Sequence, residues 1–168
     1  MRAGGCDSPR LLDPAFAPLV DKVAGLLGSL DGVLFVADAP HAQTGHAQRV
    51  AAAGAELMVS VKGNRPGSFA QLKNLPWGQA PVGDRRSEHG HGRRETRTVK
   101  AITVGTPGGL GFPHARQAVR ITRTRTIKTK TTRQTAYLVM SLPAAEAQPA
   151  DLGGWARQEW HIENRLHC

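Results

Sequence analysis

Two short apolar runs mark the centre of the predicted fold. Residues 33–37 are five consecutive apolar residues that lead into Asp38, and residues 57–61 form a second run interrupted by one serine. Runs of this length are typical of buried strands and are too short for helices. Because the apolar positions of residues 44–54 recur at helical spacing, the sequence predicts a parallel strand–helix–strand unit over residues 33–62.

Helical spacing predicts two further short helices. The first covers residues 16–27, and Gly28 stops its pattern. It is expected to pack on the sheet. The second lies within residues 66–80 and is cut off by Pro76, which a helix interior does not tolerate.

The C-terminal segment is predicted to be the last helix. Trp155, Ile162 and Leu166 fall on one apolar stripe of a helical wheel. Glu159 and Glu163 lie at the margin of that stripe. A carboxylate at such a margin can face a cleft while its helix stays packed.

The stretch before this last helix is predicted to be β structure. Polar and apolar residues alternate through residues 94–104, 117–127 and 135–142, and turns are expected at residues 105–109 and 128–133. The sequence therefore predicts an antiparallel β insertion, at about residues 85–142, and an α/β fold for the whole chain.

Composition favours a polyanionic partner. The 168 residues fit one domain at residues 16–168, behind residues 1–15, which we expect to be a disordered leader. A balance of 22 Lys and Arg against 13 Asp and Glu gives a net charge of +9, which suits nucleic acid. Two cysteines exclude a disulfide framework and a four-thiolate zinc site. Without an apolar stretch of about 20 residues, no membrane span is expected, and the expected location is the cytoplasm.

Asp38 and Glu163 are the candidate chemical groups. A carboxylate at the end of a buried strand is costly unless it binds a cation, caps a helix or meets solvent. Together, the two acids would suit a hard divalent cation such as Mg²⁺, which takes one or two protein carboxylates. A helix cap or solvated boundary residue remains the alternative for each, and no third acid lies in a predicted buried strand.

A basic segment interleaves cations with threonine through residues 116–133. Strand alternation puts Arg120 on one face, and Arg123 and Arg125 on the other. Such a segment can contact phosphates, or it can be an edge strand protected from aggregation by charge. Few aromatic residues accompany it, which argues against base stacking on single strands.

Two histidines, His89 and His91, are two positions apart in the sequence. This spacing is compatible with a metal site, but no further cysteine or histidine follows at ligand spacing. A turn leading into a basic strand is the preferred interpretation.

Five stretches of this sequence together resemble one family, the DDE transposases of insertion sequences, within them the ISAs-type or H-repeat-associated subgroup. The order and spacing of the stretches agree over roughly residues 16–168. The matching stretches are Val36–Gln43, Val61–Asn64, His91–Arg97, Tyr137–Pro143 and Trp160–His167.

The resemblance implies an RNase H-like core with a β insertion before the helix that carries the last acid. Asp38 would match the second Asp of the DDE triad, and Glu163 its Glu. Both would hold Mg²⁺ or Mn²⁺ while water, and then a 3′-hydroxyl, attacks a DNA phosphodiester.

The resemblance also implies partners. Lys62, Arg93 and Arg97 match basic residues of the family's motifs and are expected to contact DNA or brace the acids. Arg120, Arg123 and Arg125 of the basic segment complete the expected DNA-binding set. The expected partner is double-stranded DNA of transposon ends. A second copy of the chain and a full-length transposase are the other partners considered.

This sequence departs from the family in ways that bear on activity. The first Asp of the triad has no counterpart here, Glu159 stands where a basic residue or His is usual, and Cys168 stands where Trp is usual. We therefore expect a partial RNase H-like fold with little or no strand-transfer activity. The alternatives are a non-catalytic basic module that binds DNA or interferes with a full-length transposase, and an unstable remnant without function.

Overall fold

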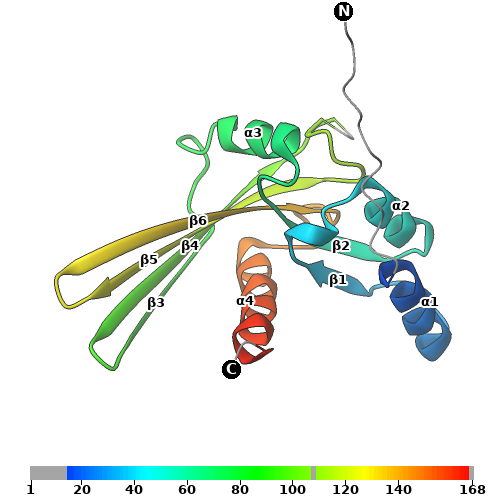
Figure 1. Cartoon of the computed structure of the whole chain (residues 1–168). Helices are drawn as coiled ribbons and strands as arrows, with labels where there is room; N and C mark the ends of the chain where they lie inside the picture. The colour runs from blue at the N-terminus through cyan, green and yellow to red at the C-terminus, as the bar shows by residue number, and fades with distance from the viewer. Residues whose placement is uncertain (1–14, 107–108, 167–168) are drawn as a thin grey trace, which may run out of the picture.

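One mixed β-sheet forms the middle layer of the described chain (Figure 1). The computed structural model describes residues 15–106 and 109–166, apart from the side chains of residues 160–166. The elements in chain order are α1 (Phe16–Leu27), β1 (Leu34–Ala37), the 3₁₀ helix η1 (Ala39–His41), α2 (Thr44–Ala52), β2 (Glu56–Val61), α3 (Pro66–Asn74), β3 (Asp84–Gly90), β4 (Arg93–Thr103), β5 (Gln117–Ile127), β6 (Lys130–Met140) and α4 (Pro149–Leu166). Within this described part the sheet has six strands in the order β1-β2-β6-β5-β4-β3.

The predicted strand–helix–strand unit is confirmed. β1 and β2 pair in parallel, with Val36 opposite Met58, and α2 connects them. Gly54 follows the helix with a φ of 79°, a conformation that favours glycine and ends the helical run. Asp38 directly follows β1, as its place in the sequence predicts.

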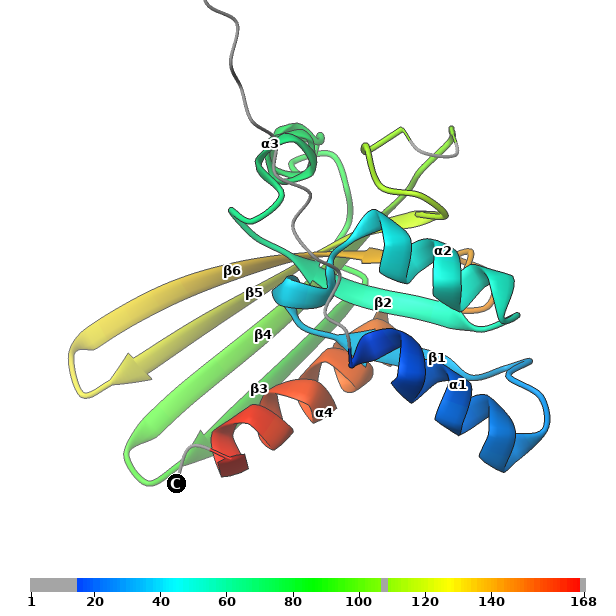
Figure 2. The ribbon, with the colours of Figure 1, turned by 45° about the vertical axis from the view of Figure 1, so that its right-hand side comes forward.

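Two apolar cores lie on opposite faces of the sheet. α1, α2 and α3 contribute side chains such as Val20, Val50 and Leu72 to the first core. α4 contributes Leu152 and Ala156 to the second. Figure 2 shows α2 and α3 on one side of the sheet and α4 on the other, so the inner part of the sheet is covered on both faces.

The predicted antiparallel β structure is confirmed as a meander of β3, β4, β5 and β6, here called the β arm. Both of its hairpins extend past the helices (Figures 1 and 2). β6 pairs antiparallel with β2, with Val139 opposite Val59, and so joins the arm to the parallel unit. The arm and the parallel unit therefore form one continuous sheet.

Two features of the β arm differ from the sequence prediction. β3 was not predicted as a strand, because its seven residues, Asp84–Gly90, are polar or glycine and carry no apolar alternation. β6 begins at Lys130, so the predicted turn at residues 128–133 shrinks to two residues, the first with a φ of 54°. Cross-strand pairing supplies the order that local sequence does not. The second short helix agrees with its prediction, because it ends at Asn74, before Pro76.

Trp77 closes the first core beyond α3. Only 3% of this residue is exposed, and its indole Nε1 donates a hydrogen bond to the carbonyl of Leu72 at 2.7 Å. The donor is therefore satisfied inside an apolar environment, as a buried tryptophan requires.

The chain is thus a mixed α/β structure with a curled sheet and, in the described part, four α-helices. The leader was predicted over residues 1–15, and all of it except residue 15 lies outside the described residues. None of the described helices is both long enough and apolar enough to cross a membrane.

Candidate functional site

The carboxyl ends of the two parallel strands meet at one polar corner. Asp38 follows β1, and Lys62 follows β2. Lys62 Nζ lies 3.1 Å from Asp38 Oδ1, and the Asn64 side chain donates a hydrogen bond to the Ala39 carbonyl at 2.5 Å. Because parallel strands end at the same sheet edge, residues 24 positions apart become neighbours.

α4 faces this corner across a groove along β1. Asp38 lines the groove together with Trp155, Gln158 and Glu159 of α4, and Leu19 of α1 lies in the same wall. The sequence places Glu159 at the margin of the helix stripe but does not predict it beside Asp38. The tertiary packing of α4 decides this, because the helix lies against β1 as well as against β3 and β4.

Glu163 belongs to α4 and stands four residues, about one helical turn, beyond Glu159. Its side chain lies outside the described residues. The structure therefore brings the helix that carries Glu163 beside the strand that ends at Asp38.

A ring stack supports the segment that follows Asp38. Phe16 of α1 stacks on His46 with ring centroids 4.0 Å apart, and the His41 ring lies 5.3 Å from that of Phe16. His46 is 2% exposed. These contacts attach η1 to α1 and α2, and so hold the backbone at Asp38 in place.

Among the described side chains, no three His, Cys, Asp or Glu groups gather closely enough to hold a metal ion. The two histidines considered as ligands, His89 and His91, stand at the end of β3 and in the β3–β4 turn. His91 and Gly92 both have positive φ values, 49° and 70°, which suit a two-residue hairpin turn. The turn interpretation therefore agrees with the described geometry.

The six expected DNA-binding residues occupy different environments. Lys62 pairs with Asp38, and Arg93 begins β4 in an exposed position. The Arg120 guanidinium lies 5.2 Å from the ring centroid of Trp77, on the face of the first core. Arg123 and Arg125 lie on the opposite face, as strand alternation predicts.

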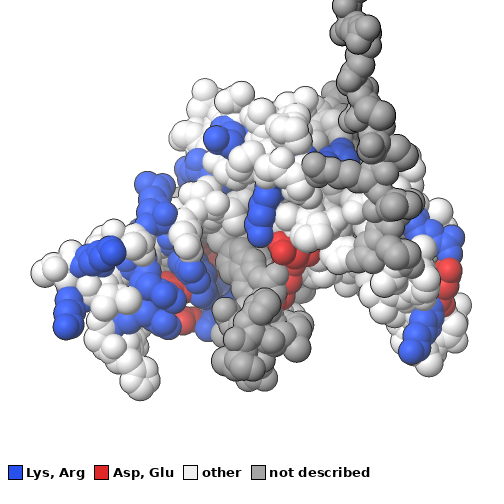
Figure 3. Space-filling view, in the orientation of Figure 1, with Lys and Arg blue, Asp and Glu red and all other residues white. Residues whose placement is uncertain are grey.

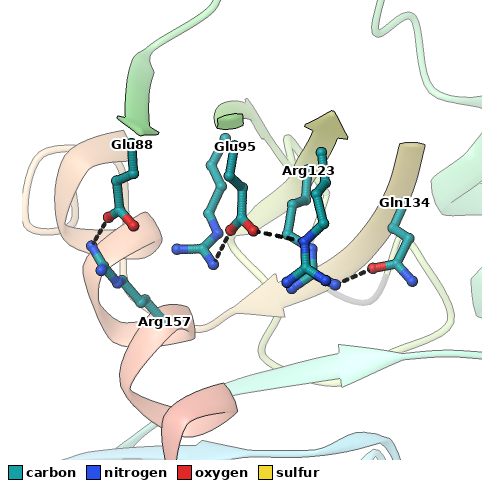
Figure 4. A network of polar contacts seen from close by, with 7 residues as sticks. Glu88, Glu95, Arg123, Gln134 and Arg157 are labelled. Atoms are coloured by element: carbon teal, nitrogen blue, oxygen red, sulfur yellow. Dashed lines mark hydrogen bonds and ion pairs between the residues drawn. The ribbon is translucent and has the colours of Figure 1, made fainter. Parts of the chain in front are cut away.

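Glu95 is the centre of a charged network on the α4 side of the β arm (Figure 4). It is 4% exposed. One of its carboxylate oxygens pairs with Arg97, and the other accepts from Arg125 Nε at 3.2 Å. Arg123 lies beside this pair and donates to the side chain of Gln134.

The network shifts two pKa values. Burial alone would raise the pKa of Glu95, but the charge of Arg97, the hydrogen bond from Arg125 and the charge of Arg123 together lower it below its usual value. Burial lowers the pKa of Arg97. Glu95 opposes that shift, while the nearby charges of Arg157 and Arg123 add to it.

α4 joins the same network. Arg157 pairs with Glu88 of β3, with 2.6 Å between Nη1 and Oε1. Figure 3 shows Lys and Arg side chains gathered over the β arm. Sequence reasoning missed Glu95, although a single acid among the arginines of residues 93–97 was a visible signal.

Comparison with known protein families and curated proteins finds no match. No model of a protein family matches the sequence, and no curated protein is similar to it at a significant level.

Proposed function

We propose that this chain is part of a DDE-type DNA strand-transfer core, which binds double-stranded DNA and holds a divalent cation between Asp38 and Glu163. One observation carries the proposal: Asp38 and α4, the helix that contains Glu163, border the same groove. An acid after a β-strand and an acid on a later helix are the arrangement that the resemblance implies. The finer assignment of an RNase H-like fold is part of this proposal.

The groups at the corner fit a hard cation. The Asp38 side chain is 32% exposed, so a hydrated ion can reach its oxygens. Lys62 lies beside Asp38, and the resemblance implies a basic residue at this position. Glu159 adds a carboxylate to the groove wall. A cation bound there would neutralise charge on a phosphodiester. Lys62 pairs with Asp38 Oδ1, so a cation that binds this oxygen would have to displace the ammonium group.

The expected partner follows from charge. A net charge of +9, with cations gathered over the β arm, favours attraction of a DNA backbone. The same features support a second candidate, a DNA-binding module without chemistry, because two carboxylates alone do not complete a two-metal site.

Binding and chemistry are tested separately. The whole chain is titrated into a fluorescent 30-base-pair duplex at several salt concentrations, and cleavage is followed with Mg²⁺ or Mn²⁺. We expect binding that weakens steeply with salt, and little or no cleavage. Absence of binding at low salt contradicts both candidates, whereas efficient cleavage of terminal-repeat DNA contradicts the non-catalytic one.

A further inference from the structure

The charged network of the β arm lies on a single sheet face. Strand register aligns Glu88, Glu95 and Arg125 in one cross-strand row. The next row contains Arg86, Arg97 and Arg123. The following row contains Asp84 and Val99. α4 borders the face there, since a Cβ on Gly153 would lie 2.9 Å from Val99 Cγ2.

Among the described side chains, cations outnumber anions on this face. They comprise five guanidinium groups and three carboxylates. The guanidinium groups belong to Arg86, Arg97, Arg123, Arg125 and Arg157, and the carboxylates to Asp84, Glu88 and Glu95. Like charges held close together cost free energy. Burial is the main cause of the lowered pKa of Arg97, and the charges of Arg157 and Arg123 lower it further. A bound anion would relieve that repulsion.

Glu95 fixes the orientation of two of these groups. Its two oxygens engage Arg97 and Arg125 separately, so both guanidinium groups are held from one buried point. Arg125 is bound through Nε, and its terminal amino groups make no hydrogen bond to the described residues. Its side chain is 34% exposed. The planar fork is therefore presented to solvent, in the geometry that binds phosphate oxygens.

We infer that Glu95 is a positioning residue that arranges Arg97 and Arg125, with Arg123 beside them, into a binding site for the phosphodiester backbone of DNA. This inference rests on the proposed function and names the surface that performs its DNA binding. Glu95 contributes through geometry, although its own charge repels the ligand.

Glu95→Gln separates geometry from net charge. The substitution removes a negative charge, so simple electrostatics predicts tighter binding. The inference predicts weaker binding, by about tenfold, because the amide no longer holds two guanidinium groups. Glu146→Gln is the matched control. Glu146 is an exposed residue in the loop before α4, and its substitution makes the same charge change outside the β arm.

Affinity is measured by fluorescence anisotropy of the 30-base-pair duplex across a salt series, with folding checked by circular dichroism. We expect Glu146→Gln to bind within twofold of the unsubstituted chain. Glu95→Gln should also show a smaller salt slope, because fewer phosphates are engaged. Equal or tighter binding by Glu95→Gln than by Glu146→Gln overturns the inference.

Arg123 provides a test that does not depend on the buried pair. Arg123→Gln should weaken binding about tenfold and reduce the salt slope by about one. Arg123→Lys keeps the charge but not the planar fork, and should recover only part of the loss. Unchanged affinity in Arg123→Gln overturns the inference even if Glu95→Gln fails to fold. Failure of the unsubstituted chain to bind at low salt instead contradicts the proposed function.

Discussion

Lys62 Nζ and Asp38 Oδ1 lie 3.1 Å apart at the carboxyl ends of two adjacent parallel strands. Asp38 is the proposed cation ligand, and Lys62 is positively charged, as the cation is. Lys62 and a divalent ion therefore compete for one carboxylate.

Lys62→Met should strengthen cation binding at Asp38 about threefold to fivefold, because the competing ammonium group is removed. Binding of Mn²⁺ by titration calorimetry measures the effect. Lys22→Met, an exposed substitution on α1, removes the same charge elsewhere and should change the affinity little. Weaker binding by Lys62→Met than by Lys22→Met would show that Lys62 supports the ion instead of competing with it.

Two adjacent glycines of α4 should respond oppositely to alanine. A Cβ on Gly154 meets nothing within 4 Å, so Gly154→Ala should stabilise the fold by about 0.5–1 kcal/mol through helix propensity. A Cβ on Gly153 would lie 2.9 Å from Val99 Cγ2, so Gly153→Ala should destabilise it by about 1 kcal/mol. Urea unfolding compares the two variants, and equal stability would refute the close approach of α4 to β4.

Glu95 should give the fold part of its acid sensitivity. Its pKa is lower in the folded chain than in the unfolded chain, so its stabilising effect is fully present above an unfolded pKa of about 4.3. That effect is lost as the pH falls through the lowered folded value. Urea unfolding between pH 3 and pH 7 should therefore show a flatter acid limb for Glu95→Gln. Parallel curves for the two proteins would contradict the assignment.

Arg120 should act on stability and not on DNA. Its guanidinium lies over Trp77, on the face opposite Arg123. Arg120→Gln should lower the free energy of unfolding by about 1 kcal/mol and leave duplex affinity within twofold. Urea unfolding and anisotropy on the same preparation measure both quantities. A large loss of affinity without loss of stability would place Arg120 in the DNA-binding surface.

The sequence predicts the elements with strong apolar periodicity. The parallel unit, α1 and the last helix follow from patterns that local spacing makes visible, and the ends of α1 agree with the predicted residues 16–27. β3 escapes prediction because it is held by pairing with β4 and has no apolar face of its own. Its order is a property of the assembled sheet.

Some residues of the candidate site could be predicted from the sequence, and others could not. Asp38 is predictable because a strand end is readable from sequence. The closeness of Asp38 and Glu159 is not predictable, because it depends on the tertiary packing of α4 beside β1. The role of Glu95 is also not predictable, since one of its two partners, Arg125, comes beside it only when β4 and β5 pair.

Binding of Mn²⁺ to the whole chain, followed by the electron paramagnetic resonance signal of the free ion, tests the central claim that Asp38 and Glu163 share a divalent cation. We expect saturable binding that weakens at least tenfold in both Asp38→Asn and Glu163→Gln. Glu146→Gln should bind as the unsubstituted chain does. Binding unchanged in Asp38→Asn or in Glu163→Gln, or absent from the unsubstituted chain at millimolar Mn²⁺, would contradict the claim.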